Sequence, residues 1–119
     1  MLPKINRLPG HLIPKTLKSK NTLYSPLFNL KLQKTDRVRP CQISFIVSAK
    51  IIKLAVQRNK LKRQLKTAIY PHLKNLKPNY NLIFLVKHPI KQASFNQIKT
   101  TFINLLSKAK LISNEKPNS

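Results

Sequence analysis

The chain has 119 residues, of which 24 are lysine or arginine and only two are acidic, so its formal net charge is +22. Soluble surfaces usually intersperse both signs, and we therefore favour a nucleic-acid partner over an ordinary solvated surface. The length and a hydrophobic content of 41% predict one domain with one core. A single cysteine excludes an internal disulfide, and no apolar run is long enough to cross a bilayer, so we expect a soluble protein of the reducing cytoplasm.

The first part of the chain predicts a basic arm followed by a short helix. Residues 1–11 combine Pro3 and Pro9 with basic side chains, and we expect this arm to be extended. A helix is predicted over residues 12–18, because Pro14 suits a first helical turn.

Two half-buried strands are predicted next, at residues 27–33 and 42–48. In each segment apolar and polar side chains alternate, which puts them on opposite faces of a sheet. The intervening segment 34–40 is short and polar, as in an antiparallel connection. The polar face is expected either to be solvated or to hold single-stranded nucleic acid, and the residues favour neither over the other. It comprises Asn29, Lys31, Gln33, Gln42 and Ser44.

The second half of the chain predicts two helices with a strand between them. The first helix covers residues 55–70, because the proline at position 71 disfavours the helical conformation of the residue before it. Residues 81–86 form a continuous apolar run, typical of a central strand. Ser94 suits the N-cap of the last helix. The elements follow in the order α, β, β, α, β, α, in a single domain at 12–110 with a flexible polar tail at 111–119.

The helix at 55–70 contains five cations within nine residues and no acid. At 100° per residue, Arg58, Lys62 and Lys66 form one row, whereas the leucines at 61 and 65 gather on another face. Like charges at this spacing destabilise an isolated helix, so a row of phosphates is the expected partner. The nucleic-acid-binding residues predicted here are Arg58, Asn59, Lys60, Lys62, Arg63 and Lys66.

Intrinsic catalysis is not expected. Nucleases that use two metal ions need several converging carboxylates, and this chain has only Asp36 and Glu115, far apart in the sequence. The three histidines show no spacing that would pair an acid with a base. Cys41 has no recognisable partner and is interpreted as a structural thiol, and neither a zinc-ligand pattern nor a glycine-rich phosphate loop is present. We assign no catalytic residue, metal ligand or cofactor to the protein alone.

Two segments around the cationic helix carry a distinctive sequence. Residues 47–50 read Val-Ser-Ala-Lys, and residues 55–63 read Ala-Val-Gln-Arg-Asn-Lys-Leu-Lys-Arg. They resemble the signature of the protein subunit of bacterial ribonuclease P, which is Val-Ser-Lys-Lys followed by Ala-Val-x-Arg-Asn-Arg-x-Lys-Arg. The likeness extends over about residues 5–112.

This resemblance implies an α+β fold: an α/β sandwich similar to the second domain of ribosomal protein S5, with a left-handed βαβ crossover that pattern alone would not give. It also implies partners. A large catalytic RNA with bound Mg²⁺ would remove the 5′ leader of precursor tRNA, while the protein, a monomer, would bind the leader and the RNA near the cleavage site. The shortage of carboxylates agrees with this division of labour.

The resemblance places a leader-binding cleft on the sheet face beside the first helix. The family usually has phenylalanine at the two matching helix positions and often an aromatic residue where Lys31 stands. Because these aromatic residues are missing, we expect the leader to be held by phosphate charge more than by base stacking. On the cationic helix, Lys60 stands where the family has an arginine, which keeps the positive charge but loses the two parallel hydrogen bonds that an arginine can donate. The implied cleft residues are Ile13, Leu17, Lys31, Ser48 and Lys50.

One alternative is a small basic ribosomal or ribosome-assembly protein without an enzymatic role, which the size and charge fit equally well. The motif at residues 58–63 separates the two interpretations. A DNA-compacting protein is less well supported, since such proteins usually have a dimerisation element or a flexible arm for the minor groove.

Overall fold

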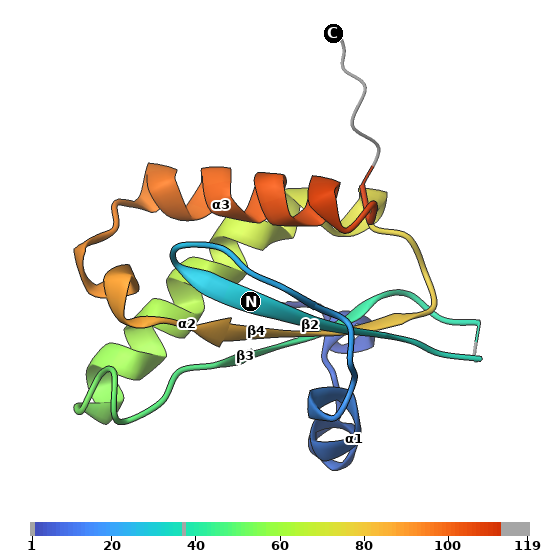
Figure 1. Cartoon of the computed structure of the whole chain (residues 1–119), viewed down its shortest axis with the longest axis horizontal. Helices are drawn as coiled ribbons and strands as arrows, with labels where there is room; N and C mark the ends of the chain where they lie inside the picture. The colour runs from blue at the N-terminus through green and yellow to red at the C-terminus, as the bar shows by residue number, and fades with distance from the viewer. Residues whose placement is uncertain (1, 37, 113–119) are drawn as a thin grey trace, which may run out of the picture.

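The computed structural model describes residues 2–36 and 38–112. At its centre is a four-stranded sheet in the order β1-β2-β4-β3, seen nearly edge-on in Figure 1. β4 lies antiparallel to β2 and parallel to β3, so the chain between β3 and β4 forms a βαβ crossover. The strands are β1 (Thr22–Leu23), β2 (Phe28–Lys34), β3 (Gln42–Ile46) and β4 (Tyr80–Val86).

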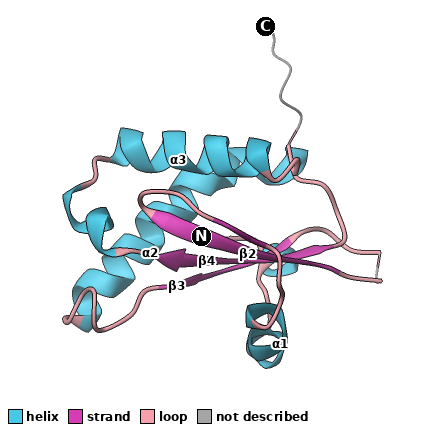
Figure 2. Cartoon of the chain, viewed as in Figure 1, coloured by secondary structure: helices cyan, strands magenta, loops and turns pink. Residues whose placement is uncertain are grey.

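Two long helices cover one face of the sheet (Figure 2). α2 (Ala55–Ile69) connects β3 to β4, and α3 (Phe95–Lys108) follows β4. Apolar side chains at alternate strand positions meet apolar side chains at helical spacing between the two layers. The centre of this core is an aromatic cluster whose ring centroids lie 4.6 to 6.0 Å apart. It consists of Phe28, Phe45, Phe84 and Phe102.

The opposite face of the sheet carries the short helix α1 (Ile13–Leu17). Thr16 is fully buried, and its Oγ1 lies 3.3 Å from Gln33 Oε1 on β2. Just beyond the helix, Ser19 O accepts a hydrogen bond of 3.1 Å from Lys31 Nζ. These contacts hold α1 against β2 at one end of the sheet, and the other end of this face has no helix over it (Figure 1).

Local sequence explains where the long helices begin and end. α3 starts with a capping box, in which Ser94 Oγ accepts from Gln97 N and Gln97 Oε1 accepts from Ser94 N. α2 ends just before Pro71, as predicted. Short 3-10 segments complete the structure: η1 (Lys4–Asn6), η2 (Gly10–Leu12), η3 (Tyr70–Asn75) and η4 (His88–Gln92).

The predicted α+β sandwich and its six elements are confirmed, with two differences in the sheet. β1 was not predicted, because a strand of two residues is too short to show an alternating pattern. The strands β2 and β3 run in opposite directions, as the short connection suggested, but they are not neighbours. β4 lies between them and pairs with both.

The N-terminal segment differs from the expected extended arm. Leu2 and Leu8 are buried, and Leu8 N donates to Ile43 O at 3.0 Å beside the edge strand β3. The Asn6 side chain is also buried, and its Nδ2 donates to Cys41 O at 2.9 Å. The segment therefore belongs to the folded domain, because these apolar side chains cover the sheet edge.

The C-terminal boundary also differs from the expectation. Leu111 is fully buried in the core, and its carbonyl accepts from Lys77 N at 2.9 Å. The domain boundary predicted at residue 110 is therefore too early, while residues 113–119 of the predicted tail lie outside the described residues.

Within the part of the chain that the structure describes, no helix has the length and apolar character needed to span a membrane.

Candidate nucleic-acid interface

Helix α2 carries the five cations that the sequence predicted, two of them exposed and three half-buried. The leucines at 61 and 65 point into the core, so the opposite face of the helix is free for a partner. Asp36 is the one acidic residue in the described part of the chain, and it lies after β2, away from the helix. No carboxylate within residues 2–36 and 38–112 therefore pairs with these cations. Asn59, Lys60 and Arg63 are exposed, and Lys62 and Lys66 are half-buried.

Arg58 differs from its neighbours on this helix. Its Nη1 donates to Ile52 O at 2.9 Å and to Lys53 O at 2.6 Å, and the side chain is half-buried. Part of the Arg58 guanidinium is therefore engaged by the protein's own backbone. The guanidinium braces the loop that leads from β3 into α2, and because it has five N–H donors it can still reach an external phosphate.

The sheet face that carries α1, called here the α1-side face, contains all five polar residues predicted for it. The strand registers arrange its side chains in three rungs across β2, β4 and β3. The contribution of β4 was missed, because a continuous apolar run does not reveal which of its side chains point to which face. The rungs are Asn29, Leu85 and Ile46; then Lys31, Ile83 and Ser44; then Gln33, Asn81 and Gln42.

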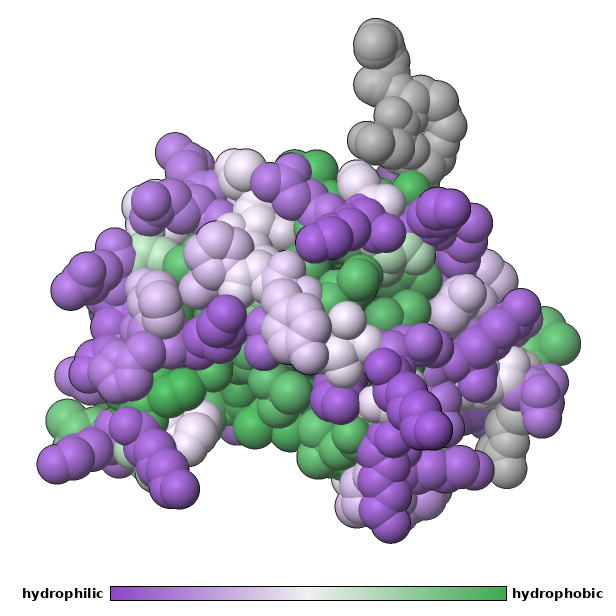
Figure 3. Space-filling model, viewed as in Figure 1, coloured by the Kyte–Doolittle hydropathy of each residue, from purple (hydrophilic) through white to green (hydrophobic). Residues whose placement is uncertain are grey.

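A hollow in the surface lies beneath the sheet, between α1 and the loop that precedes α2 (Figure 3). Its lining is apolar and its borders are hydrophilic. The half-buried Ile46 and Leu85 contribute apolar surface to this face. The hollow therefore offers an apolar floor between two hydrophilic borders.

The five predicted cleft residues lie on three segments, which are α1, β2 and the loop between β3 and α2. Ile13 and Leu17 are half-buried on α1, and Lys31 is tied to the segment just after it. In the loop before α2, Ser48 Oγ accepts from Lys50 N at 3.0 Å, and Lys50 is exposed. The Ser48 hydroxyl thus helps to form the turn that contains Lys50.

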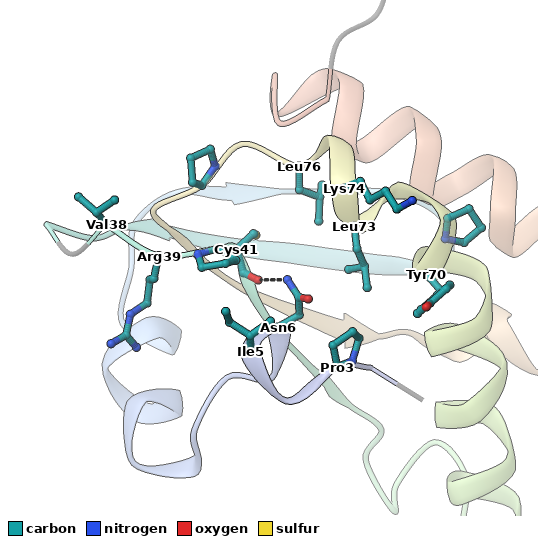
Figure 4. A pocket seen from close by; sticks show the side chains of 13 residues that line it. Pro3, Ile5, Asn6, Val38, Arg39, Cys41, Tyr70, Leu73, Lys74 and Leu76 are labelled. Carbon is teal, nitrogen blue, oxygen red and sulfur yellow. Dashed lines mark hydrogen bonds between the residues drawn. The ribbon is translucent and has the colours of Figure 1, made fainter.

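A second concavity, of about 890 Å³ and mostly apolar, lies behind the connection from β2 to β3 (Figure 4). The N-terminal segment, this connection and η3 form its walls. Ile5 and Tyr70 are largely exposed there, whereas Cys41 is buried and its peptide oxygen accepts the Asn6 bond drawn in Figure 4. Sequence reasoning did not find this cavity, because it depends on the docking of the N-terminal segment.

Burial raises the pKa of the Cys41 thiol to about 12, which fits its interpretation as a structural residue. His11 and His88 are exposed and His72 is half-buried, each on a different element. In the described ranges, no three His, Cys, Asp or Glu side chains form a group that could hold a metal ion.

Comparison with known proteins identifies a family that covers nearly the whole chain. The family model described as Ribonuclease P matches residues 2–110. A ribonuclease P protein component from Rippkaea orientalis is 31% identical over 116 residues, which cover 93% of this chain and 91% of that protein. One from a Synechococcus species is 36% identical over 73 residues, or 61% of this chain, and the match spans about half (55%) of that relative's length.

Solved structures share the fold. The RNase P protein from Staphylococcus aureus superposes with a TM-score of 0.81 at 21% identity, covering 92% of this chain and all of that one. The RNase P protein from Thermotoga maritima gives a TM-score of 0.74 at 18% identity, covering 86% and 96% of the two chains. The matched residues include the whole cationic helix α2, and the chain belongs to the Ribonuclease P family of proteins.

Proposed function

We propose that this chain is the protein component of ribonuclease P and assists a catalytic RNA in removing the 5′ leader from precursor tRNA. The observation that carries the proposal is the acid-free cationic face of α2, on a chain of this family. The relatives named above are ribonuclease P protein components, and they give no support to the ribosomal alternative.

The catalytic RNA is the proposed partner of α2. The exposed Lys60 and Arg63 lie on the helix face opposite the buried leucines, where phosphates can approach without displacing core side chains. Arginine can bind a phosphate through two parallel hydrogen bonds, whereas lysine acts as a point charge. Arg63 is therefore expected to fix the orientation of the RNA, and Lys60, Lys62 and Lys66 to add attraction that falls with salt.

The leader of precursor tRNA is the proposed ligand of the hollow beside α1. The apolar floor is proposed to accommodate bases, and Lys31 on β2 and the exposed Lys50 in the loop before α2 are proposed to meet phosphates of the leader. The side chains predicted for the cleft include no aromatic ring, and ring stacking is worth roughly 1 to 3 kcal/mol per base. The leader is therefore held with little dependence on its sequence.

The chemical step is assigned to the RNA. Two carboxylate side chains in 119 residues are too few for a two-metal site, so the Mg²⁺ ions are proposed to be held through the RNA. The protein contributes charge neutralisation and substrate positioning, and enters the cytoplasmic complex as a monomer.

Reconstitution tests this function. Purified protein, the cognate catalytic RNA and precursor tRNA are combined at low Mg²⁺, with each component also omitted in turn. Cleavage at the mature 5′ end is expected only with the RNA present, and faster with protein than without it. The products should be a tRNA with a 5′-phosphate and a leader with a 3′-hydroxyl.

Two outcomes would contradict the proposal. Site-specific cleavage by RNA-free protein, surviving controls for contaminating nuclease, would place the chemistry in the protein. An identical cleavage rate with and without protein, over a range of Mg²⁺ concentrations, would remove its assisting role.

A further inference from the structure

We propose that the groove drawn in Figure 4 binds an extended segment of a second protein, in which large apolar side chains stand next to acidic ones. The groove is the apolar concavity of about 890 Å³ described above. None of the residues predicted to bind the catalytic RNA or the leader lines it. The inference therefore goes beyond the proposed function and does not rest on it.

The groove is elongated. Figure 4 shows η1 along one side and η3 with the loop that follows it along the other. Val38 and Arg39 lie at one end, and Tyr70 lies at the other. The volume is near the upper end of the range for small-molecule sites, roughly 300 to 1,000 Å³. A groove of this shape and size accommodates several consecutive residues of an extended chain.

Large apolar side chains are left exposed around this groove. Ile5 is 59% exposed, Tyr70 55% and Val38 93%, and Leu73 adds half-buried apolar surface. Apolar surface that gathers in one place on a folded domain marks an interaction site, because leaving it in water costs free energy. Tyrosine is also one of the residues that contribute most at the centre of protein interfaces. The occupant is therefore expected to bring apolar side chains.

The walls of the groove are preorganised. Proline fixes the backbone angle φ, and four of the nine prolines of the chain line the groove. Both sides are also tied to the rest of the fold, since Asn6 Nδ2 donates to Cys41 O at 2.9 Å and Lys77 N donates to Leu111 O at 2.9 Å. An occupant thus meets a formed groove, and its binding costs this chain little conformational entropy. The prolines are Pro3, Pro40, Pro71 and Pro78.

Charge decides which apolar partner fits. Arg39 and Lys74 are in the lining, and among the described residues no acidic side chain joins them. The chain as a whole carries a formal charge of +22, so a second copy of it would be repelled. Acidic side chains beside the apolar ones would give the partner the complementary charge and would orient it in the groove.

The lining also argues against an RNA segment in this groove. Among the described residues it contains one aromatic side chain, Tyr70, and one carboxamide, Asn6. Successive bases would therefore find no second ring to stack on. The Asn6 Nδ2 group already donates to Cys41 O, which leaves base edges with few hydrogen-bonding partners. Aliphatic and proline surface suits the aliphatic side chains of a protein.

A selection from random peptides tests the inference on the full chain. A phage-displayed library of twelve-residue peptides is selected on the immobilised protein at physiological salt, with excess polyuridylic acid to occupy the cationic faces. The enriched peptides are expected to combine large apolar residues with neighbouring aspartate or glutamate. The most enriched peptide is then synthesised, and its affinity is measured by calorimetry. In NMR spectra it should shift the methyl signals of Ile5, Val38 and Leu73.

Matched variants separate the groove from general charge. Tyr70→Ala and Lys74→Glu change exposed side chains of the groove, so the fold should be retained. Each should weaken binding of the selected peptide about tenfold, the loss typical of a residue at the centre of an interface. Lys91→Glu makes the same change in total charge on η4, and Ile103→Ala removes an exposed apolar side chain from α3. Both should bind the peptide nearly as wild type does.

Several results would overturn the inference. No enriched peptide, or equal losses for Lys74→Glu and Lys91→Glu with none for Tyr70→Ala, would leave only general attraction by charge. Shifts of the same methyl signals by sodium decanoate or by polyuridylic acid, but not by the peptide, would indicate a fatty acid or a nucleobase. Dimerisation that Tyr70→Ala abolishes would indicate a second copy.

The outcome is independent of the proposed function. These measurements use no catalytic RNA, so failure of the reconstitution described above would leave them interpretable. Their own failure would leave the assistance to the catalytic RNA standing.

Discussion

Arg39 and Asn79 hold each other at the base of the connection between β2 and β3. Arg39 N donates to Asn79 Oδ1 at 3.1 Å, and Asn79 N donates to Arg39 O at 2.8 Å. The Asn79 carbonyl also accepts from Thr35 N at 2.7 Å. Asn79 has a φ of 72°, in the left-handed region that asparagine tolerates better than most residues. Asn79 thus fixes both this connection and the backbone of Arg39.

Replacement of Asn79 separates the contribution of its side-chain hydrogen bond from that of its left-handed backbone conformation. Asn79→Ala loses the side-chain hydrogen bond and strains the backbone, and should reduce the free energy of unfolding by about 1 to 3 kcal/mol. Asn79→Gly loses only the bond, because glycine adopts positive φ freely, and should be less destabilised. Urea unfolding of both variants measures the difference. Equal losses would show that the backbone conformation contributes nothing.

Arg63 and Arg58 should behave differently although both lie on α2. Arg63→Ala should leave the melting temperature unchanged and flatten the dependence of log K on log salt for the catalytic RNA by about 0.7 to 0.9 per lost phosphate contact. Arg58→Ala should in addition speed amide hydrogen exchange in residues 51–54, because its bonds to Ile52 O and Lys53 O are lost.

Lys99→Ala is the control for this comparison, because it removes an exposed cation from a different helix, α3. An unchanged salt slope for Arg63→Ala would mean that the assigned face of α2 does not contact phosphate. Exchange rates in the loop that match those of wild type would mean that Arg58 does not brace it.

Lys31 should matter for the leader and not for the tRNA body. Lys31→Ala should weaken binding of leader-bearing precursor tRNA to the reconstituted complex and leave mature tRNA nearly unaffected, with similar losses for different leader sequences. Binding of both tRNAs across a salt series provides the measurement. Equal losses for both would show that Lys31 lies outside the leader cleft, and a strong preference among leader bases would show that stacking groups participate.

Cys41 should be protected in the native protein. With its pKa raised by burial from 9.0 to about 12, the thiol is protonated at pH 8 and should react with iodoacetamide far more slowly than in urea.

The raised pKa of Cys41 also links the free energy of unfolding to pH. The contribution of the protonated thiol to stability is complete below pH 9 and is lost as pH rises toward 12. Wild type should therefore lose more stability than Cys41→Ala between pH 8 and pH 10. Rapid native labelling at pH 8 would contradict this account.

The sequence predicted the elements whose limits are set locally. Pro71 ends α2, and Ser94 with Gln97 caps α3, so their boundaries follow from steric and hydrogen-bonding rules that act over three or four residues. The two faces of α2 followed from helical periodicity, which the burial of Leu61 and Leu65 confirms.

Features that depend on distant contacts could not be predicted in this way. The docking of the N-terminal segment depends on the bond from Asn6 to Cys41 O, thirty-five positions away. The rung of Gln33, Asn81 and Gln42 depends on the strand registers, and the apolar run of β4 gave no sign that Asn81 would lie on the α1-side face. The predicted nucleic-acid contacts themselves stay predictions.

The bonds from Arg58 to two successive carbonyls, together with the turn at Ser48, fix the loop before α2 through contacts within the chain itself. A partner that docks on this region therefore meets a preorganised surface and loses little conformational entropy there. Encounter should then be limited by diffusion steered by charge, with no folding step to slow it. Differences in affinity among variants of this helix should consequently appear in how long the complex survives, and the rate at which it forms should respond chiefly to salt.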